Sequence, residues 1–180
     1  HSPRAHSPRS STASSEHMGP PACVSLALFA IFCFLVASGL ALPLPSSPVH
    51  HIAFGSCNAH TRDQSIWKSI TDAQPDLFVW LGDVVYADTV VFPLIWTDTP
   101  LDIMRGKFDA QKHSPLYSNL RKNTPIVGVW DDHDYGMNNG GSQYKDRSAS
   151  QTIFMDFLDE PQDSPRRQRP GIYTSYFLPG

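Results

Sequence analysis

Residues 76–88 read DLFVWLGDVVYAD, a run that begins with apolar residues and ends with polar ones. Continuous apolar residues from Leu77 to Leu81 are typical of a central strand in a parallel sheet, because such a strand is covered on both faces. Gly82 and Asp83 follow directly. This run therefore predicts a buried strand within residues 76–86, with polar side chains where it ends.

Strand and helix patterns alternate on both sides of this run. Short apolar runs predict further strands at residues 50–55, 124–130 and 171–178. Apolar residues at helical spacing predict helices at residues 61–73, 102–111, 116–122 and 147–159, with residues 87–115 otherwise irregular. Repeated alternation of this kind predicts a layered α/β fold.

Polar clusters follow three of the predicted strands: GSCN at residues 55–58, LGDVVYAD at 81–88 and DDHDYGMNN at 131–139. Because ligands bind beyond the carboxyl ends of strands in open α/β sheets, we expect the three clusters to converge. Thiolate, phenolate and imidazole suit a transition metal, whereas carboxylate and amide oxygens suit a harder cation. The competing interpretations are an Asp that only caps a helix and a lone Cys that is only a small buried residue.

The first 41 residues have a different composition. Residues 1–17 are rich in Ser, Pro and His, and they precede the first methionine, Met18, so we interpret them as a disordered prefix or a gene-model artefact. Residues 18–41 are typical of a secretory signal peptide. The uncharged stretch 22–42 is also long enough for a signal anchor. We expect a secreted or extracytoplasmic protein, with the endomembrane lumen included, or a membrane-anchored one.

Charge and cysteine usage narrow the possible partners. The 180-residue chain has Lys+Arg 14 and Asp+Glu 17, a net charge of −3, which argues against a specific nucleic-acid-binding surface. Cys23 and Cys33 belong to the leader, so residues 42–180 keep only Cys57. A lone cysteine in an exported domain predicts a buried, paired or metal-bound thiol rather than a disulfide framework.

The polar clusters resemble a known family. GSCN, LGDVVYAD and VWDDHDYGMNNGG, followed by SQTIFMDFLDEPQDSPRRQRPGIYTSY, look like the alkaline phosphatase D-like (PhoD-like) metallophosphatases over about residues 50–178. The resemblance implies an α/β/β/α metallophosphoesterase (calcineurin-like) fold with two sheets flanked by helices. It also implies hydrolysis of small-molecule phosphate monoesters or phosphodiesters with metal-activated water, using iron and calcium or other divalent metals. We expect the protein to be a monomer.

The same resemblance assigns four metal ligands by position. Cys57 would be the thiolate ligand of the transition metal, and Asp83 the carboxylate that bridges the metals. Tyr86 would be a phenolate ligand, and Asn138 an amide ligand of the second metal.

The resemblance also assigns catalytic and supporting roles. His133 would contact phosphate or donate a proton, with Asp132 as its catalytic companion, and Asp88 and Asp132 would orient the ligands. Asn139 replaces an Asp that is frequent in the family. Four basic residues could contact phosphate or be simply solvated: Arg105, Lys107, Arg121 and Arg166.

Two alternatives remain beside the hydrolase. Family members continue beyond the position that matches Gly180, so we interpret residues 42–180 as the N-terminal portion of a catalytic domain truncated at its C-terminus. Such a chain could be a catalytically incomplete fragment that binds metal or phosphate, with an exposed strand at 171–178. The other alternative is a cysteine hydrolase with Cys57 as nucleophile, His133 as base and Asp132 as orienting residue.

Overall fold

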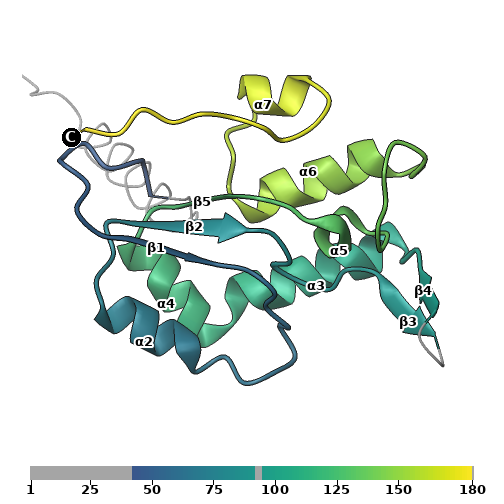
Figure 1. Cartoon of the computed structure of the whole chain (residues 1–180), viewed down its shortest axis with the longest axis horizontal. Helices are drawn as coiled ribbons and strands as arrows, with labels where there is room; N and C mark the ends of the chain where they lie inside the picture. The colour runs from purple at the N-terminus through teal and green to yellow at the C-terminus, as the bar shows by residue number, and fades with distance from the viewer. Residues whose placement is uncertain (1–41, 92–94, 180) are drawn as a thin grey trace, which may run out of the picture. The chain divides into compact units, whose positions relative to one another are not determined.

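The computed structural model of the chain describes residues 42–91 and 95–179 (Figure 1). All of them belong to one unit, Leu40–Gly180. The predicted prefix 1–17 and leader 18–41 lie outside the described residues. No helix among the described residues has the length and apolar character needed to cross a membrane.

The described residues form a mixed α/β structure with a parallel sheet, which confirms the α/β class that the sequence predicts. Five strands and six helices follow one another in this order: β1 (Ile52–Gly55), α2 (Ile66–Asp72), β2 (Leu77–Leu81), β3 (Thr89–Val91), β4 (Ile95–Thr97), α3 (Leu101–His113), α4 (Pro115–Asn123), β5 (Ile126–Val129), α5 (Asp132–Tyr135), α6 (Arg147–Phe157) and α7 (Pro165–Gln168).

Strands β1, β2 and β5 form a parallel sheet in the order β1-β2-β5, with β2 at the centre as the sequence predicts. Val79 of β2 stands opposite Phe54 on one side and Val127 on the other. Strands β3 and β4 form a separate antiparallel pair. Since β1, β2 and β5 run in the same direction, the loops that follow them leave from the same edge of the sheet.

One face of the sheet packs against helices α2 and α4, which lie below it in Figure 1. Phe78 and Trp80 alternate with outward residues and point to this face, where they meet Trp67 of α2 and Tyr117 of α4 in edge-to-face and tilted ring contacts. The indole nitrogen of Trp80 donates a buried hydrogen bond of 2.8 Å to the Tyr117 hydroxyl. This aromatic cluster fixes the central strand and therefore the loop that begins at its end.

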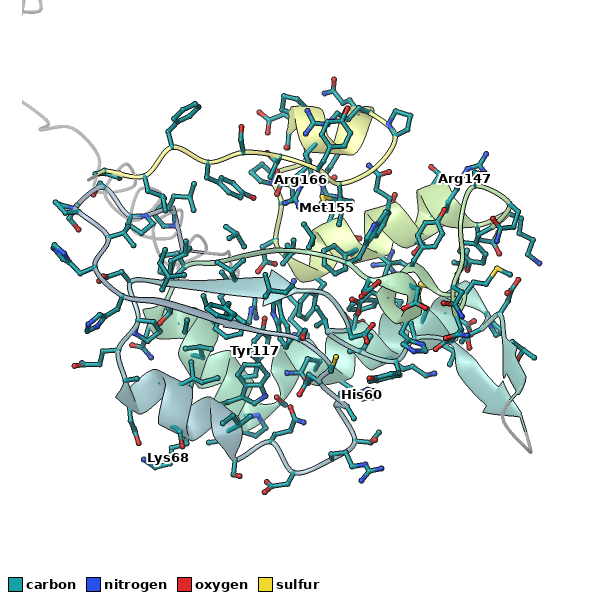
Figure 2. All side chains as sticks on the ribbon, in the orientation of Figure 1. His60, Lys68, Tyr117, Arg147, Met155 and Arg166 are labelled. Atoms are coloured by element: carbon teal, nitrogen blue, oxygen red, sulfur yellow. The ribbon has the colours of Figure 1, made fainter. Side chains whose placement is uncertain are left out.

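The opposite face of the sheet is apolar and only partly covered. Ile52, Phe54, Leu81 and Val129 alternate with the core-facing positions, and these residues are 51%, 68%, 50% and 42% exposed. Leu77 and Val127 share this face by register and are buried. Residues 165–178 lie on this side of the sheet, where Arg166 is labelled in Figure 2. The sequence predicts a strand covered on both faces, and in the structure the cover on this face is incomplete.

Two predicted elements differ from the structure. Helix α2 begins at Ile66 rather than near residue 61, because the Asp63 carboxylate holds the preceding turn by accepting hydrogen bonds from the Ser65 amide and hydroxyl. The predicted strand at 171–178 is wrong, since this segment has no regular secondary structure. The neighbouring edge of β5 is engaged by a side chain instead: Arg166 donates a hydrogen bond of 2.6 Å to the Gly128 carbonyl.

The sequence patterns also did not indicate the β3–β4 pair or the short helices α5 and α7. Helix α5 is a four-residue turn with a capping box, in which Asp131 and Asp134 each accept a backbone hydrogen bond from the other end of the turn. Such short elements carry too few apolar positions to show a period.

Candidate metal centre

The loops after β2 and β5 meet at a glycine. Gly82 directly follows β2 with φ of +107°, and a Cβ atom there would lie 2.6 Å from the Cβ of Asp131 and 3.0 Å from its backbone nitrogen. Only a residue without a side chain allows this approach. The contact brings Asp83, on the next position, beside the acidic run that begins at Asp131.

Asp83 stands at the centre of the site. Its residue is 8% exposed, and its Oδ1 atom is buried without a hydrogen-bond partner. Its Oδ2 atom lies 3.7 Å from the Sγ atom of Cys57. Burial raises the pKa of this carboxyl group, and the charges of Asp131 and Asp132 act in the same direction against the lowering effect of His133. The unpaired buried oxygen is the type of atom that a cation would satisfy.

Three ligand groups converge around that carboxylate. One potential ligand atom from each of Asp83, Asp132 and His133 lies within 4.8 Å of the others. Carboxylate oxygens and an imidazole nitrogen are ligands for divalent and trivalent cations. The predicted convergence of the β2 and β5 clusters is therefore present in the structure.

Asp134 connects the loop after β2 to the loop after β5. Its carboxylate accepts hydrogen bonds of 3.1 and 2.9 Å from the backbone amides of Val84 and Val85, and a third of 3.2 Å from Asp131. Burial raises the pKa of Asp134 to about 8, although the three hydrogen bonds oppose the shift. The sequence placed Asp134 inside the acidic motif but gave it no role, because a structural carboxylate and a ligand look the same in a motif.

The imidazole of His133 is oriented by a buried carboxylate. Its Nδ1 atom lies 2.9 Å from both carboxylate oxygens of Asp88, whose side chain is fully buried. The ring also packs against Tyr86, with the two ring centroids 4.4 Å apart. Burial raises the pKa of Tyr86, and the neighbouring Asp83 and Cys57 raise it further. With Nδ1 engaged by Asp88, Nε2 is the ring nitrogen suited to binding a cation or exchanging a proton.

The loop after β1 brings Cys57 to the same place. Cys57 adopts φ of +57°, is exposed, and is not in a disulfide. The next residue, Asn58, donates a backbone hydrogen bond of 2.7 Å to the Asp83 carbonyl. Its side-chain amide donates to the Val84 carbonyl and to Gln111 of α3, both at 2.9 Å. The thiol is thus an exposed group at the site, not the small buried residue of the competing interpretation.

The Asp132 carboxylate contacts backbone amides rather than the His133 ring. Its Oδ1 atom accepts the His133 backbone amide at 3.0 Å, and its Oδ2 atom accepts the Asn139 backbone amide at 2.6 Å. Asn138 is half-buried in the same turn. The carboxylate that holds the imidazole ring is that of Asp88, and the ligand role of Asn138 stays a prediction.

An open cleft adjoins the site. It has a volume of about 860 Å³, and its lining includes Cys57, Tyr86, His60, Arg62 and Lys107. Burial lowers the pKa of His60, and the positive charge of Lys107 lowers it further. The cleft has the size of a small-molecule site and brings positively charged groups next to the candidate ligands.

The other three basic residues that could contact phosphate form ion pairs with acidic residues of the chain. Arg105 pairs with Asp156 at 2.9 Å, Arg121 pairs with Asp159, and buried Arg166 pairs with Glu160 at 3.2 Å. Lys107 is the one of the four predicted residues that lines the cleft described above.

Comparison with known proteins identifies a matching family and a structural neighbour. A family model described as "PhoD-like phosphatase" matches residues 52–156, more than half of the chain. A solved structure titled "Structure of PhoD" has the same fold, with a TM-score of 0.56 and 18% sequence identity. The alignment covers 77% of this chain and 31% of that one, so the chain spans about a third of the length of its structural neighbour. No curated protein matches the sequence. The match to the family model over the β1, β2 and β5 loops shows that the chain belongs to the PhoD-like phosphatase family.

Proposed function

We propose that this chain carries part of a metal-dependent site that hydrolyses phosphate monoesters or diesters. The observation that carries the proposal is the convergence of Asp83, Asp132 and His133 within 4.8 Å around a buried carboxylate oxygen without a partner. Membership of a phosphatase family gives the class of reaction.

The residues at the site fit the predicted metals. Cys57, Asp83 and Tyr86 offer a thiolate, a carboxylate and a phenolate, a donor set suited to iron, and the amide of Asn138 suits calcium. Bound metals would supply an activated water and neutralise charge on the phosphoryl group. Burial raises the pKa of Asp83 and of Tyr86, and neighbouring acidic groups raise both further, so a cation at this place would favour their charged forms.

The chain's own residues would hold the substrate and move the proton. With Cys57, Asp83, Tyr86 and Asn138 as the metal ligands, His133 would use Nε2 to donate a proton to the leaving oxygen rather than to bind a metal, since Asp88 engages Nδ1 and fixes the ring. The cleft beside Cys57 and Tyr86 would receive the alcohol part of the ester, and its basic residues Arg62 and Lys107, with one acidic residue, Asp63, favour an anionic substrate.

The two-sheet layering of the calcineurin-like fold is part of the same proposal. A second sheet would pack on the exposed part of the apolar face, which carries Ile52, Phe54, Leu81 and Val129. Support comes from the general rule that parallel sheets bury both faces. A longer chain that includes such a sheet should bind less of a hydrophobic dye than residues 42–180 alone, and equal dye binding would contradict the proposal.

Metal analysis and hydrolysis assays together test the function. The purified chain is analysed for iron, calcium and zinc, and assayed with p-nitrophenyl phosphate and bis-p-nitrophenyl phosphate before and after treatment with a chelator. We expect bound metal and chelator-sensitive hydrolysis. Asp83→Asn should lower both by more than the ~10- to 100-fold typical of outer-shell partners, whereas Asp163→Asn, on an exposed residue, should change neither. Metal binding without hydrolysis would favour the incomplete-fragment alternative.

The cysteine-nucleophile alternative predicts a different result. In the structure the His133 ring is held by Asp88, and the side-chain oxygens of Asp132 accept backbone amides. A metal-bound Cys57 thiolate should be protected from alkylating reagents, and removal of the metal should expose it. Rapid alkylation of Cys57 in metal-loaded protein, with loss of activity, would support the nucleophile instead.

We also propose that the protein is exported, with residues 18–41 as a cleaved signal peptide or as an uncleaved anchor. The support is the apolar run at residues 24–36 and the small residues Ala37, Ser38 and Gly39 that follow it. N-terminal sequencing of protein from the culture medium and from membranes separates the two forms, and exclusive recovery from the cytosol would contradict both.

A further inference from the structure

Lys107 of α3 reaches across to the loop that follows β2. Its Nζ atom donates hydrogen bonds of 3.1, 2.9 and 3.0 Å to three consecutive carbonyls, those of Tyr86, Ala87 and Asp88. The residue is half-buried on the same face of α3 as Met104 and Phe108, which are fully buried in the core. The packing of α3 against the core therefore fixes the position of the Lys107 ammonium relative to the loop.

These three contacts use all the donors of the side chain. An ammonium group has three N–H bonds, and each has a carbonyl partner here. Although Lys107 lines the cleft, it has no N–H left for a phosphate oxygen. Its contribution to hydrolysis must therefore pass through the loop it holds, apart from the general effect of its charge.

The held loop carries two of the side chains that surround His133. Tyr86 packs on the imidazole ring with a centroid distance of 4.4 Å, and Asp88 holds its Nδ1 atom at 2.9 Å. Between them, the Ala87 amide donates a hydrogen bond of 3.1 Å to the His133 carbonyl. A shift of this loop would displace the imidazole and the phenol together.

We propose that Lys107 is a positioning residue, whose ammonium fixes the Tyr86–Asp88 backbone and thereby sets the place of Tyr86 and His133 in the site. Three converging carbonyls repel one another, and a single positive charge among them removes that repulsion. Residues 82–88 belong to neither a helix nor a strand, so the contact from α3 supplies hydrogen bonds to backbone groups that a helix or sheet would otherwise provide.

The proposal is tested with Lys107→Met, which keeps the length and apolar stem of the side chain and removes its charge and donors. Lys107→Arg keeps the charge, but its planar guanidinium cannot match three converging carbonyls as an ammonium does. Lys122→Met, on an exposed lysine of α4, is the matched control. Circular dichroism checks that each full chain is folded; if Lys107→Met is unfolded, Lys107→Arg decides the test.

The first readout needs neither metal nor activity. Hydrogen exchange of the Ala87 amide is measured in the metal-free chain, where the bond to the His133 carbonyl protects it. We expect exchange at Ala87 to become about tenfold or more faster in Lys107→Met, which corresponds to the loss of at least one hydrogen bond to a charged group. Lys107→Arg should fall between Lys107→Met and wild type, and Lys122→Met should match wild type. Unchanged exchange at Ala87 in Lys107→Met would overturn the proposal.

The second readout rests on the proposed function. With a phosphate ester as substrate, Lys107→Met should lower kcat about 10- to 100-fold, as expected for a small misplacement of reacting groups. KM should change less than about threefold, because the lysine has no donor left for the substrate. A large rise in KM with unchanged kcat would overturn the positioning role and indicate direct substrate contact. If the wild-type chain hydrolyses nothing, the proposed function fails, and the exchange experiment alone decides whether Lys107 holds the loop.

Discussion

Replacing Gly82 by alanine should separate the two loops that build the site. Gly82 has φ of +107°, and a new Cβ atom would lie 2.6 Å from the Asp131 Cβ and 3.0 Å from its backbone nitrogen. The left-handed backbone costs about 1–2 kcal/mol for a residue with a side chain. Overpacking adds about 1–3 kcal/mol. The neighbour cannot move away cheaply, because the Asp131 amide is held by the Asp134 carboxylate.

The expected loss for Gly82→Ala is therefore about 2–5 kcal/mol in the free energy of unfolding, a large part of the ~5–15 kcal/mol typical of a domain. Urea denaturation followed by tryptophan fluorescence measures it, and metal content should fall in the same variant because Asp83 moves away from Asp132. Gly106→Ala is the control: Gly106 lies in α3 with no atom within 4 Å of the new methyl group, so the helix should gain up to about 1 kcal/mol. A Gly82→Ala variant with wild-type stability and metal content would refute the reasoning.

Three further predictions concern buried or capping groups. Tyr117→Phe leaves the buried indole donor of Trp80 without its acceptor and should cost about 1–3 kcal/mol of unfolding free energy, measured by urea denaturation. Asp134→Ala leaves two buried amides of the β2 loop without an acceptor and should cost about 2–6 kcal/mol in the same assay. The Asp76 carboxylate accepts hydrogen bonds from the backbone amides of His51 and His50, and these bonds lower its pKa in the folded chain. The stabilising effect of the charged carboxylate is therefore complete above the unfolded pKa of 3.8. It is lost as pH falls through the lower pKa of the folded chain. Thermal melts of Asp76→Asn at pH 2–7 should accordingly show a lower Tm than wild type at neutral pH and a difference that shrinks below about pH 4.

Each of these three predictions has a result that would contradict it. Tyr173→Phe, on a residue 65% exposed, should leave stability unchanged, and an equal loss there and at Tyr117 would remove the hydrogen-bond explanation. For Asp134→Ala, unchanged amide protection at Val84 and Val85 would show that the carboxylate does not hold the loop. For Asp76→Asn, a stability difference that stays constant down to pH 2 would exclude the carboxylate charge as its source.

The central part of the fold and site follows from local sequence patterns. The continuous apolar run before Gly82 predicts the central strand β2, and Asp83 follows from its position at the end of that strand. The convergence of Asp83 with Asp132 and His133 follows from the topology of a parallel sheet, in which consecutive loops leave from one edge. Each strand and the polar cluster after it are adjacent in the chain, and the parallel topology then brings the clusters together, so sequence patterns are sufficient to predict these features.

Other features depend on contacts between distant segments, and for that reason no local pattern reveals them. Lys107 reads as a solvated surface lysine, and its three carbonyl partners come from a loop about twenty residues away. The apolar segment 171–178 has the composition of a strand, but a strand forms only where another strand offers its edge, and Arg166 occupies the neighbouring position on β5. Composition indicates only what each residue or segment prefers. Tertiary packing decides whether residues 171–178 form a strand and which groups Lys107 contacts.

The backbone of the site is held in an unfavourable conformation before any ligand binds. Cys57 and Asp83 adopt φ of +57° and +47°, at a cost of about 1–2 kcal/mol each for residues with side chains. Such a conformation persists only where neighbouring contacts determine it. Asn58 provides them, because its amide bonds to the Asp83 carbonyl and its side chain links Val84 to Gln111 of α3.

The electrostatics of the site add to this cost. The buried Asp83 carboxylate has a raised pKa and an oxygen without a partner, next to the charges of Asp131 and Asp132. Strain and like-charge repulsion therefore lower the stability of the metal-free chain at the place where three ligand atoms converge. A cation that binds these atoms only in the folded chain shifts the folding equilibrium by mass action and removes the repulsion at the same time. The arrangement that weakens the fold is thus the one that the proposed metal site would relieve.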